Sequence, residues 1–234
     1  MKKEFLGIIL FLLFINSQLL FSQCGKINYK ISVTEPEIKS ADVKERFSGL
    51  IDEARKQNYE LNFNGTASSF DVIKSIASNS EQENYFSDIA RLAFGSRYKT
   101  IVDRQNNIVY ELTDDKNVLK TENAMPNWKI SSESKQIEQY SCYKATYEEF
   151  FINRKGIKSS RVITAWFAPS LPYSFGPKSY FGLPGLILEL TENKTTFLAT
   201  RINLIEGLTK IELPKGKTIT REEYDNKLKA QMGM

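Results

Sequence analysis

Residues 161–190 read RVITAWFAPSLPYSFGPKSYFGLPGLILEL, and in this run two short strands flank a long connection. In the first strand, 161–167, neither alternate set of side chains is polar, and in the second, 186–190, only Glu189 interrupts the apolar run. Because side chains alternate between the two faces of a strand, both strands are predicted to be covered on both sides. Helices would cover one side. The other would be closed by a second sheet layer or by an apolar cavity that holds a ligand.

The connection Pro169–Gly185 is long for a hairpin loop, and loops of this length are usually functional or disordered. Disorder is not expected, because aromatic residues supply apolar area to bury. Proline followed by glycine in 183–186 favours a type II turn with Gly185 at positive φ. The segment is either a rigid plug that closes one end of the sheet or a lid over an apolar site. The candidate ligand-binding residues are Trp166, Tyr173, Phe175, Tyr180, Phe181, Leu183 and Pro184.

Strand-like runs, rich in β-branched and aromatic residues, fill most of the remaining chain. They are 26–34, 59–63, 67–73, 98–102, 108–112, 118–121, 128–131, 137–147 and 196–205. Apolar residues at helical spacing predict an amphipathic helix over 41–57. Thr220 and Glu223 form a capping box that predicts a second helix near 220–231. The polar run 77–87 is predicted to be a loop.

Strand follows strand along the chain, with one helix near each end and no βαβ alternation. This order indicates an α+β, mostly β fold: a large curved antiparallel sheet or open half-barrel with one or two helices packed on it. The length of residues 23–234 suits a single β-rich domain.

The first residues have the pattern of a secretory signal peptide, which we predict to span residues 1–22. Lys2 and Lys3 precede an apolar run, Phe5–Ile15, that is too short to span a bilayer comfortably, and Ser22 offers a small residue for cleavage. An uncleaved N-terminal anchor is the alternative. We therefore expect an exported, soluble chain, periplasmic or secreted, with no transmembrane segment after cleavage.

Two cysteines, Cys24 and Cys142, remain after that cleavage. A lipid anchor on Cys24 is not favoured, because the preceding residue is Gln23 rather than a small residue. In an oxidising compartment the two thiols are candidates for a disulfide, and the alternative is two separate thiols with Cys142 buried.

The composition excludes several chemistries. The chain contains no histidine, which removes Ser-His-Asp and Cys-His catalysis and the usual zinc sites. No glycine-rich phosphate loop is present, so no metal and no cofactor is expected. The formal charge of +4 is a mild excess without a clustered basic face, which does not suit nucleic-acid binding. The adjacent carboxylates of Glu148-Glu149 and Asp114-Asp115 would point to opposite faces of a strand and are not expected to converge as a catalytic pair.

Residues Gly182-Leu183-Pro184-Gly185-Leu186-Ile187 form a hexapeptide that matches the one naming the GLPGLI family of bacterial envelope proteins, which this sequence resembles. The similar surroundings are Trp128, the run Ile137–Ala145, the run Thr164–Phe167 and the run Ser174–Pro177. The resemblance covers roughly residues 98–205. It implies an exported, soluble, β-rich protein of unassigned function, and it supplies no catalytic residues.

The leading functional hypothesis is a non-enzymatic envelope protein that binds an apolar small molecule or lipid beside the aromatic loop. The alternative is an interaction module that docks on an outer-membrane receptor or assembly, because exposed strand edges suit that role. A third hypothesis is a histidine-free hydrolase, which would require Asp or Glu side chains about 5–10 Å apart in a polar cleft.

Overall fold

The computed structural model describes residues 23–35, 37, 40–73, 81–153, 156–206 and 209–231. The predicted signal peptide, 1–22, therefore lies outside the described residues. Within them, one open sheet of twelve strands runs in the order β12-β6-β5-β4-β3-β2-β1-β11-β10-β9-β8-β7. Every pairing is antiparallel except the short β12–β6 pair. The mostly β, open-sheet prediction is confirmed.

The strands are β1 Gln23–Val33, β2 Asn58–Phe63, β3 Ala67–Val72, β4 Lys99–Asp103, β5 Ile108–Leu112, β6 Val118–Glu122, β7 Lys129–Ile137, β8 Tyr140–Ile152, β9 Lys158–Ala168, β10 Leu186–Glu192, β11 Thr195–Glu206 and β12 Thr218–Ile219. The first strand, β1, lies in the middle of the sheet and pairs with both β2 and β11. It thereby joins a limb built from the first half of the chain to a limb built from the second half. The predicted strand 137–147 is in fact interrupted by a tight turn between β7 and β8.

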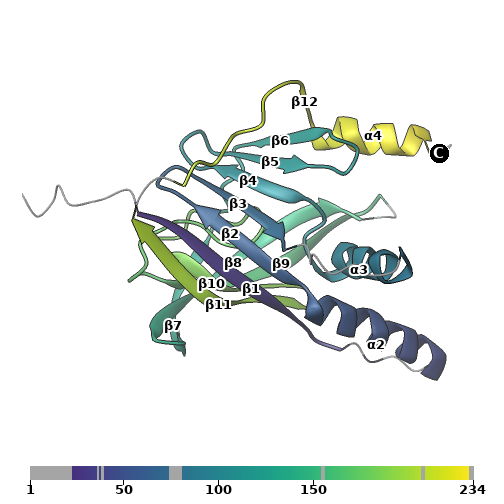
Figure 1. Ribbon diagram of the computed structural model, residues 1–234, viewed down its shortest axis with the longest axis horizontal. Helices are drawn as coiled ribbons and strands as arrows, with labels where there is room; N and C mark the ends of the chain where they lie inside the picture. The colour runs from purple at the N-terminus through teal and green to yellow at the C-terminus, as the bar shows by residue number, and fades with distance from the viewer. Residues whose placement is uncertain are drawn as a thin grey trace, which may run out of the picture.

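Three helices lie on the right-hand side of the view in Figure 1: α2 Ala41–Lys56, α3 Glu81–Phe94 and α4 Arg221–Gln231. The rings of Phe47 and Phe94 join α2 to α3, with centroids 5.6 Å apart. The capping box is confirmed, since the Glu223 amide donates to Thr220 Oγ1 at 3.1 Å and the Thr220 amide donates to the Glu223 carboxylate at 2.6 Å. The loop predicted over 77–87 was wrong from residue 81 onward, because the apolar positions that form α3 follow its polar first turn.

Aromatic side chains fill the concave side of the sheet. Tyr59 stacks on Phe70 with ring centroids 5.4 Å apart, and Phe197 meets Tyr59 edge-on at the same distance. The Tyr29 hydroxyl donates a 2.6 Å hydrogen bond to the carbonyl of Ile187, which ties β1 to the start of β10. All five residues are fully buried. Such aromatic clusters bury large areas and fix the relative position of the strands.

The connection Pro169–Gly185 packs into this concave side, as the plug alternative predicted. Phe175 is 1% exposed and exchanges a backbone hydrogen bond with Ile187, whose amide donates to the Phe175 carbonyl at 2.9 Å. The predicted type II turn was wrong. Within this connection, the glycine with a positive φ is Gly182, at 94°. Gly185 is required for a different reason, because a Cβ at this position would lie 2.3 Å from the carbonyl oxygen of Ala168.

Burial on both faces is confirmed for β10 but not for β9. Leu186, Ile187, Leu188 and Leu190 are fully buried. On the outer face of β9, however, Val162 is 60% exposed. A strand with apolar residues on both faces therefore does not require a second layer: on the outer face of β9, Trp166 is covered by the Lys135 side chain and Val162 is left exposed.

The disulfide prediction was wrong. Cys24 lies on β1 and Cys142 on β8, and β11, β10 and β9 separate these strands in the sheet. Four strand spacings of about 4.8 Å greatly exceed the Cα separation that a disulfide tolerates. Both side chains are fully buried in the structure, and the two thiols do not join. Within the described residues, no helix combines the length and apolar character needed to cross a bilayer.

Candidate functional site

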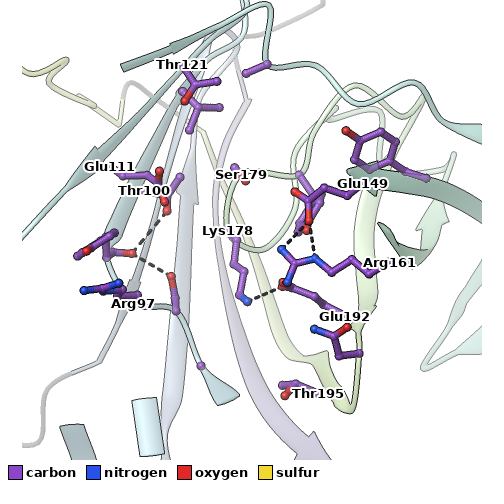
Figure 2. Close-up of a pocket in the computed structure, with 18 of the residues that line it drawn as sticks. Arg97, Thr100, Glu111, Thr121, Glu149, Arg161, Lys178, Ser179, Glu192 and Thr195 are labelled. Atoms are coloured by element: carbon purple, nitrogen blue, oxygen red, sulfur yellow. Dashed lines mark hydrogen bonds and ion pairs between the residues drawn. The ribbon is translucent and has the colours of Figure 1, made fainter. Parts of the chain in front are cut away.

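A cleft of about 920 Å³ opens between the two limbs of the curled sheet. Figure 2 shows its opposing walls, with the β4–β6 limb on one side and β8–β11 on the other. Thr100, Glu111 and Thr121 line the first wall, and residues 178–180 of the plug reach in from the second. Polar and charged side chains dominate the lining, so this cavity differs in chemistry from the apolar site that the sequence suggested.

Four charged side chains form an ion cluster on the second wall: Glu149, Arg161, Lys178 and Glu192. Arg161 lies between the two carboxylates, with Nη2 2.5 Å from Glu149 Oε2 and Nη1 2.6 Å from Glu192 Oε1. Lys178 Nζ contacts the other Glu192 oxygen at 2.6 Å. The Glu192 side chain is only 10% exposed and that of Lys178 20% exposed. Two cations thus balance two carboxylates in a largely buried setting, as such charges require.

Strand register explains how three members of the cluster meet. Glu149 is the direct neighbour of Arg161 across the β8–β9 pair, so both side chains project from the same face. Glu192 pairs with Ile163 on that face as well. Glu148 is exposed on the opposite face, which confirms that Glu148 and Glu149 do not converge.

The fourth member, Lys178, comes from the plug. Its backbone is left-handed, with φ of 56°, a conformation that costs a non-glycine residue free energy and is found at functional sites more often than elsewhere. Figure 2 shows its side chain extending along the wall to Glu192. The ion pair therefore fixes the plug to the last residue of β10.

The charges of Glu192 and Arg161 stabilise one another through their surroundings. Burial favours the neutral form of Glu192, but Lys178 and Arg161 outweigh it and hold the pKa of Glu192 below its usual range. Burial would lower the pKa of Arg161, yet the carboxylates of Glu192 and Glu149 raise it above its ordinary value. Burial, followed by these same carboxylates, strongly raises the pKa of the neighbouring Tyr180, so its hydroxyl remains protonated and able to donate a hydrogen bond.

The opposite wall is built around Tyr98, which precedes β4. The guanidinium of Arg97 lies 4.9 Å from the centre of its ring and that of Arg221 lies 6.0 Å away. Arg221, the first residue of α4, also forms an ion pair with Glu111. The two cations on this wall are more exposed than the charges of the ion cluster: the Arg221 side chain is 45% exposed, and Arg97 is a solvent-facing cation at the rim.

The structure brings only Tyr180 of the sequence-predicted site residues into the cleft lining. Phe175, Phe181 and Leu183 are each 1% exposed within the core. The remaining three lie elsewhere: Tyr173 is half-buried against Phe63, Pro184 is exposed, and Trp166 is half-buried on the outer face beneath the Lys135 ammonium, 4.4 Å from its ring. Their assignment to a ligand site stays a prediction, and in this conformation they do not form one surface.

Sequence reasoning missed the ion cluster, although a signal was present. Arg161 falls in the same alternate set as Ile163 and Ala165, and Glu192 in the same set as Leu190. A charge in phase with buried residues predicts a buried, paired charge. Among the described residues, no three potential ligands group closely enough to hold a metal ion.

Comparisons with known proteins support the fold and leave the activity open. Residues 148–189, which include Glu149, Arg161 and Lys178, match a family model described as "Protein of unknown function (Porph_ging)". No curated protein matches the chain. Two solved structures are similar, "Structure of PNGF-II in C2 space group" with a TM-score of 0.50 and "Structure of PNGF-II in P21 space group" with a TM-score of 0.49, both at 18% identity. Each match covers 88% of this chain but only 32% and 33% of the two solved chains, so this chain spans about a third of their length. At 18% identity, the likeness to the first of these structures bears on the fold alone.

Proposed function

We propose that the chain is an exported, non-enzymatic ligand-binding protein of the GLPGLI type whose ligand occupies the cleft between the two limbs of the sheet. The observation that carries this proposal is the ion cluster of Glu149, Arg161, Lys178 and Glu192 in the wall of a 920 Å³ cleft. Burial of charges costs free energy even when they are paired, so a cluster of paired charges in the wall of a cleft supports a role in positioning a polar ligand.

The ligand of this proposal carries polar groups, in contrast to the wholly apolar ligand expected from the sequence. Hydroxyl groups of Thr100, Thr121, Ser179 and Tyr180 line the cleft together with the ion cluster. An apolar molecule would strip water from these groups without replacing its hydrogen bonds, which is unfavourable. Exposed Leu92 and Met125 at the rim offer apolar contact to a second part of the ligand.

Binding suits the cleft better than carboxylate hydrolysis does. Glu149 and Glu192 do converge on one arginine in a polar cleft, the geometry that the hydrolase hypothesis requires. A general acid, however, needs a raised pKa, and that of Glu192 is lowered. Ion pairs also occupy both carboxylate oxygens of Glu192.

Native mass spectrometry of the protein purified from its own cell envelope tests this proposal. Ser179 lies in the cleft lining, so Ser179→Trp is expected to fill the cleft and abolish any retained small molecule. Ser170→Trp is the matched control, because Ser170 is an exposed residue of the same plug outside the lining. Extraction of the released compound into water rather than chloroform is expected for a polar ligand.

Two outcomes would contradict the proposal. One is the absence of any bound compound in the wild-type protein. The other is equal retention by the Ser179→Trp and Ser170→Trp variants, which would place the compound elsewhere. Recovery of a purely apolar compound that Ser179→Trp does not displace would instead favour a site behind the plug.

A further inference from the structure

The far end of the β8–β9 hairpin stands free of the rest of the sheet. β7 pairs with β8 only as far as Thr146, and β10 pairs with β9 only from Ile163. Beyond these points, the two strands of the hairpin pair only with each other, residues 147–152 with residues 158–162. The last pair of this ladder is Ile152 with Lys158. At about 3.3 Å per residue, this two-stranded ribbon extends some 16 Å past its neighbours. Figure 1 shows it projecting away from the sheet.

Large apolar side chains cluster at this end of the hairpin. We call Phe150, Ile152, Ile157 and Val162 the apolar tip; they are 62%, 66%, 57% and 60% exposed. Among the other large hydrophobic residues described, only Tyr85, at 65%, is more than 54% exposed. An exposed apolar cluster of this kind on a projecting element marks an interaction site rather than ordinary surface scatter.

Register places most of the tip on one face. Phe150 and Ile152 are two residues apart on β8, and Val162 is the partner of Glu148 in the same alternate set, so these side chains share the outer face. That face is opposite to the one on which Glu149 and Arg161 contribute to the cleft. The tip can therefore contact a partner without entering the cleft.

The charge of the hairpin selects among partners. From Phe150 to Lys158 the sequence contains three basic residues and no acidic one. Glu148 is exposed on the outer face nearer the sheet, and Arg161 is paired with Glu149 on the opposite face. The ammonium of Lys158 lies 5.5 Å from the ring centre of Phe150, so a cation and an apolar side chain are presented together. Aromatic and aliphatic residues combined with lysine and arginine are the chemistry of elements that lie in the interface of an anionic bilayer.

We infer that the end of the β8–β9 hairpin is a membrane-contact element, whose apolar tip enters the interface of an anionic lipid bilayer while the ammonium of Lys158 lies among the headgroups. This inference does not depend on the ligand proposed for the cleft. It names a second surface, on the other face of the same hairpin.

A site-specific fluorescent label tests the inference in the full chain. Ser160 is exposed directly across from Phe150, so Ser160→Cys allows labelling without removing a tip residue. Cys24 and Cys142 are fully buried, and burial raises the pKa of Cys142 to about 11, so the new thiol is expected to react selectively. An environment-sensitive fluorophore at position 160 is expected to shift to the blue with phosphatidylglycerol–phosphatidylethanolamine vesicles. The same label at Lys215→Cys, on a distant exposed residue, is expected not to shift.

Variants of the tip separate this contact from membrane binding by any other segment. Phe150→Ser with Ile152→Ser is expected to weaken vesicle partitioning at the position-160 label by more than about 10-fold, because two largely exposed apolar side chains are lost. Tyr85→Ser is the matched control, since Tyr85 is equally exposed but lies on α3, and it is expected to leave partitioning unchanged.

Four results would overturn the inference. They are no shift at position 160 with anionic vesicles, an equal shift at position 215, an unchanged shift in the double serine variant, and equal partitioning into phosphatidylcholine vesicles. A shift that depends on protein concentration and needs no vesicles would assign the tip to a second copy of the chain and would also overturn it.

Discussion

Replacement of Arg161 by methionine tests the physical basis of the ion cluster. Methionine keeps much of the side-chain length but removes the charge that contacts Glu149 at 2.5 Å and Glu192 at 2.6 Å. Removal of one partner from a buried ion pair typically costs about 3–5 kcal/mol. Here Glu149 is 29% exposed and Lys178 still contacts Glu192, so part of the loss is offset. We therefore expect the free energy of unfolding to fall by about 2–3 kcal/mol at pH 7.

The pH dependence of this loss is the more specific prediction. In the wild type, the lowered pKa of Glu192 contributes stability above its unfolded value of about 4.3, and this stability is lost as the pH falls through the folded value. Without Arg161, only Lys178 opposes the effect of burial, so the pKa of Glu192 is expected to rise. The variant then binds a proton more readily, and the difference from wild type narrows as the pH falls from 7 toward 4.

Urea denaturation at the two pH values measures both effects, with the fluorescence of Trp128 and Trp166 as the signal. Arg46→Met is the matched control: Arg46 pairs with Asp42 on the surface of α2, its side chain is 79% exposed, and such pairs contribute less than about 1 kcal/mol. A loss in Arg161→Met no larger than that of the control at pH 7 would refute the argument. A loss of equal size at pH 7 and pH 4 would do the same.

Three further substitutions test the packing around the plug and at the C-terminal helix. Tyr29→Phe removes the 2.6 Å hydrogen bond to the Ile187 carbonyl in a fully buried site and is expected to cost about 1–2 kcal/mol in urea denaturation. Gly185→Ala places a Cβ against backbone and is expected to cost about 1–3 kcal/mol, whereas Gly49→Ala, with open space on α2, is expected to be neutral or stabilising. Thr220→Ala is expected to weaken α4 by about 1 kcal/mol, measured as faster amide exchange in that helix alone.

Local pattern was sufficient to predict most of the elements. The alternation of apolar and polar residues predicted the ends of β1 and β9 to within three residues. The capping box formed by Thr220 and Glu223 predicted the start of α4. α3 was missed because its first turn is polar, and among its residues whose burial is described, 85–94, only Ala90 is fully buried. The apolar positions of α3 are nevertheless as periodic as those of α2, so the amphipathic pattern was present in the sequence and the polar first turn obscured it.

The site was harder to predict because its members come from three separated segments. Glu149 and Arg161 meet through the β8–β9 register, which a hairpin prediction could supply. Lys178 and Glu192 meet them only because the plug folds back along the concave side, and no local pattern records that path. For Trp166, the sequence predicted a ring that lines a ligand site, because tryptophan on a strand is usually covered. In the structure, the side chain of Lys135 lies over the ring on the outer face and covers it instead.

The aromatic connection Pro169–Gly185 shows why an apolar lining does not by itself identify a ligand. The concave side of a curled sheet must be filled, and the same apolar side chains are required whether the filler is a bound molecule or the protein's own chain. Here Phe175, Phe181 and Leu183 occupy that space and are 1% exposed. The cleft remains open beside Lys178, in the middle of the plug, because charged side chains there cannot be packed as the aromatic ones are. On this fold, the binding site therefore lies where the apolar side chains that fill the concave side of the sheet end. Arg161 and Glu192 mark that place, because these charged residues fall in the same alternate sets as buried residues.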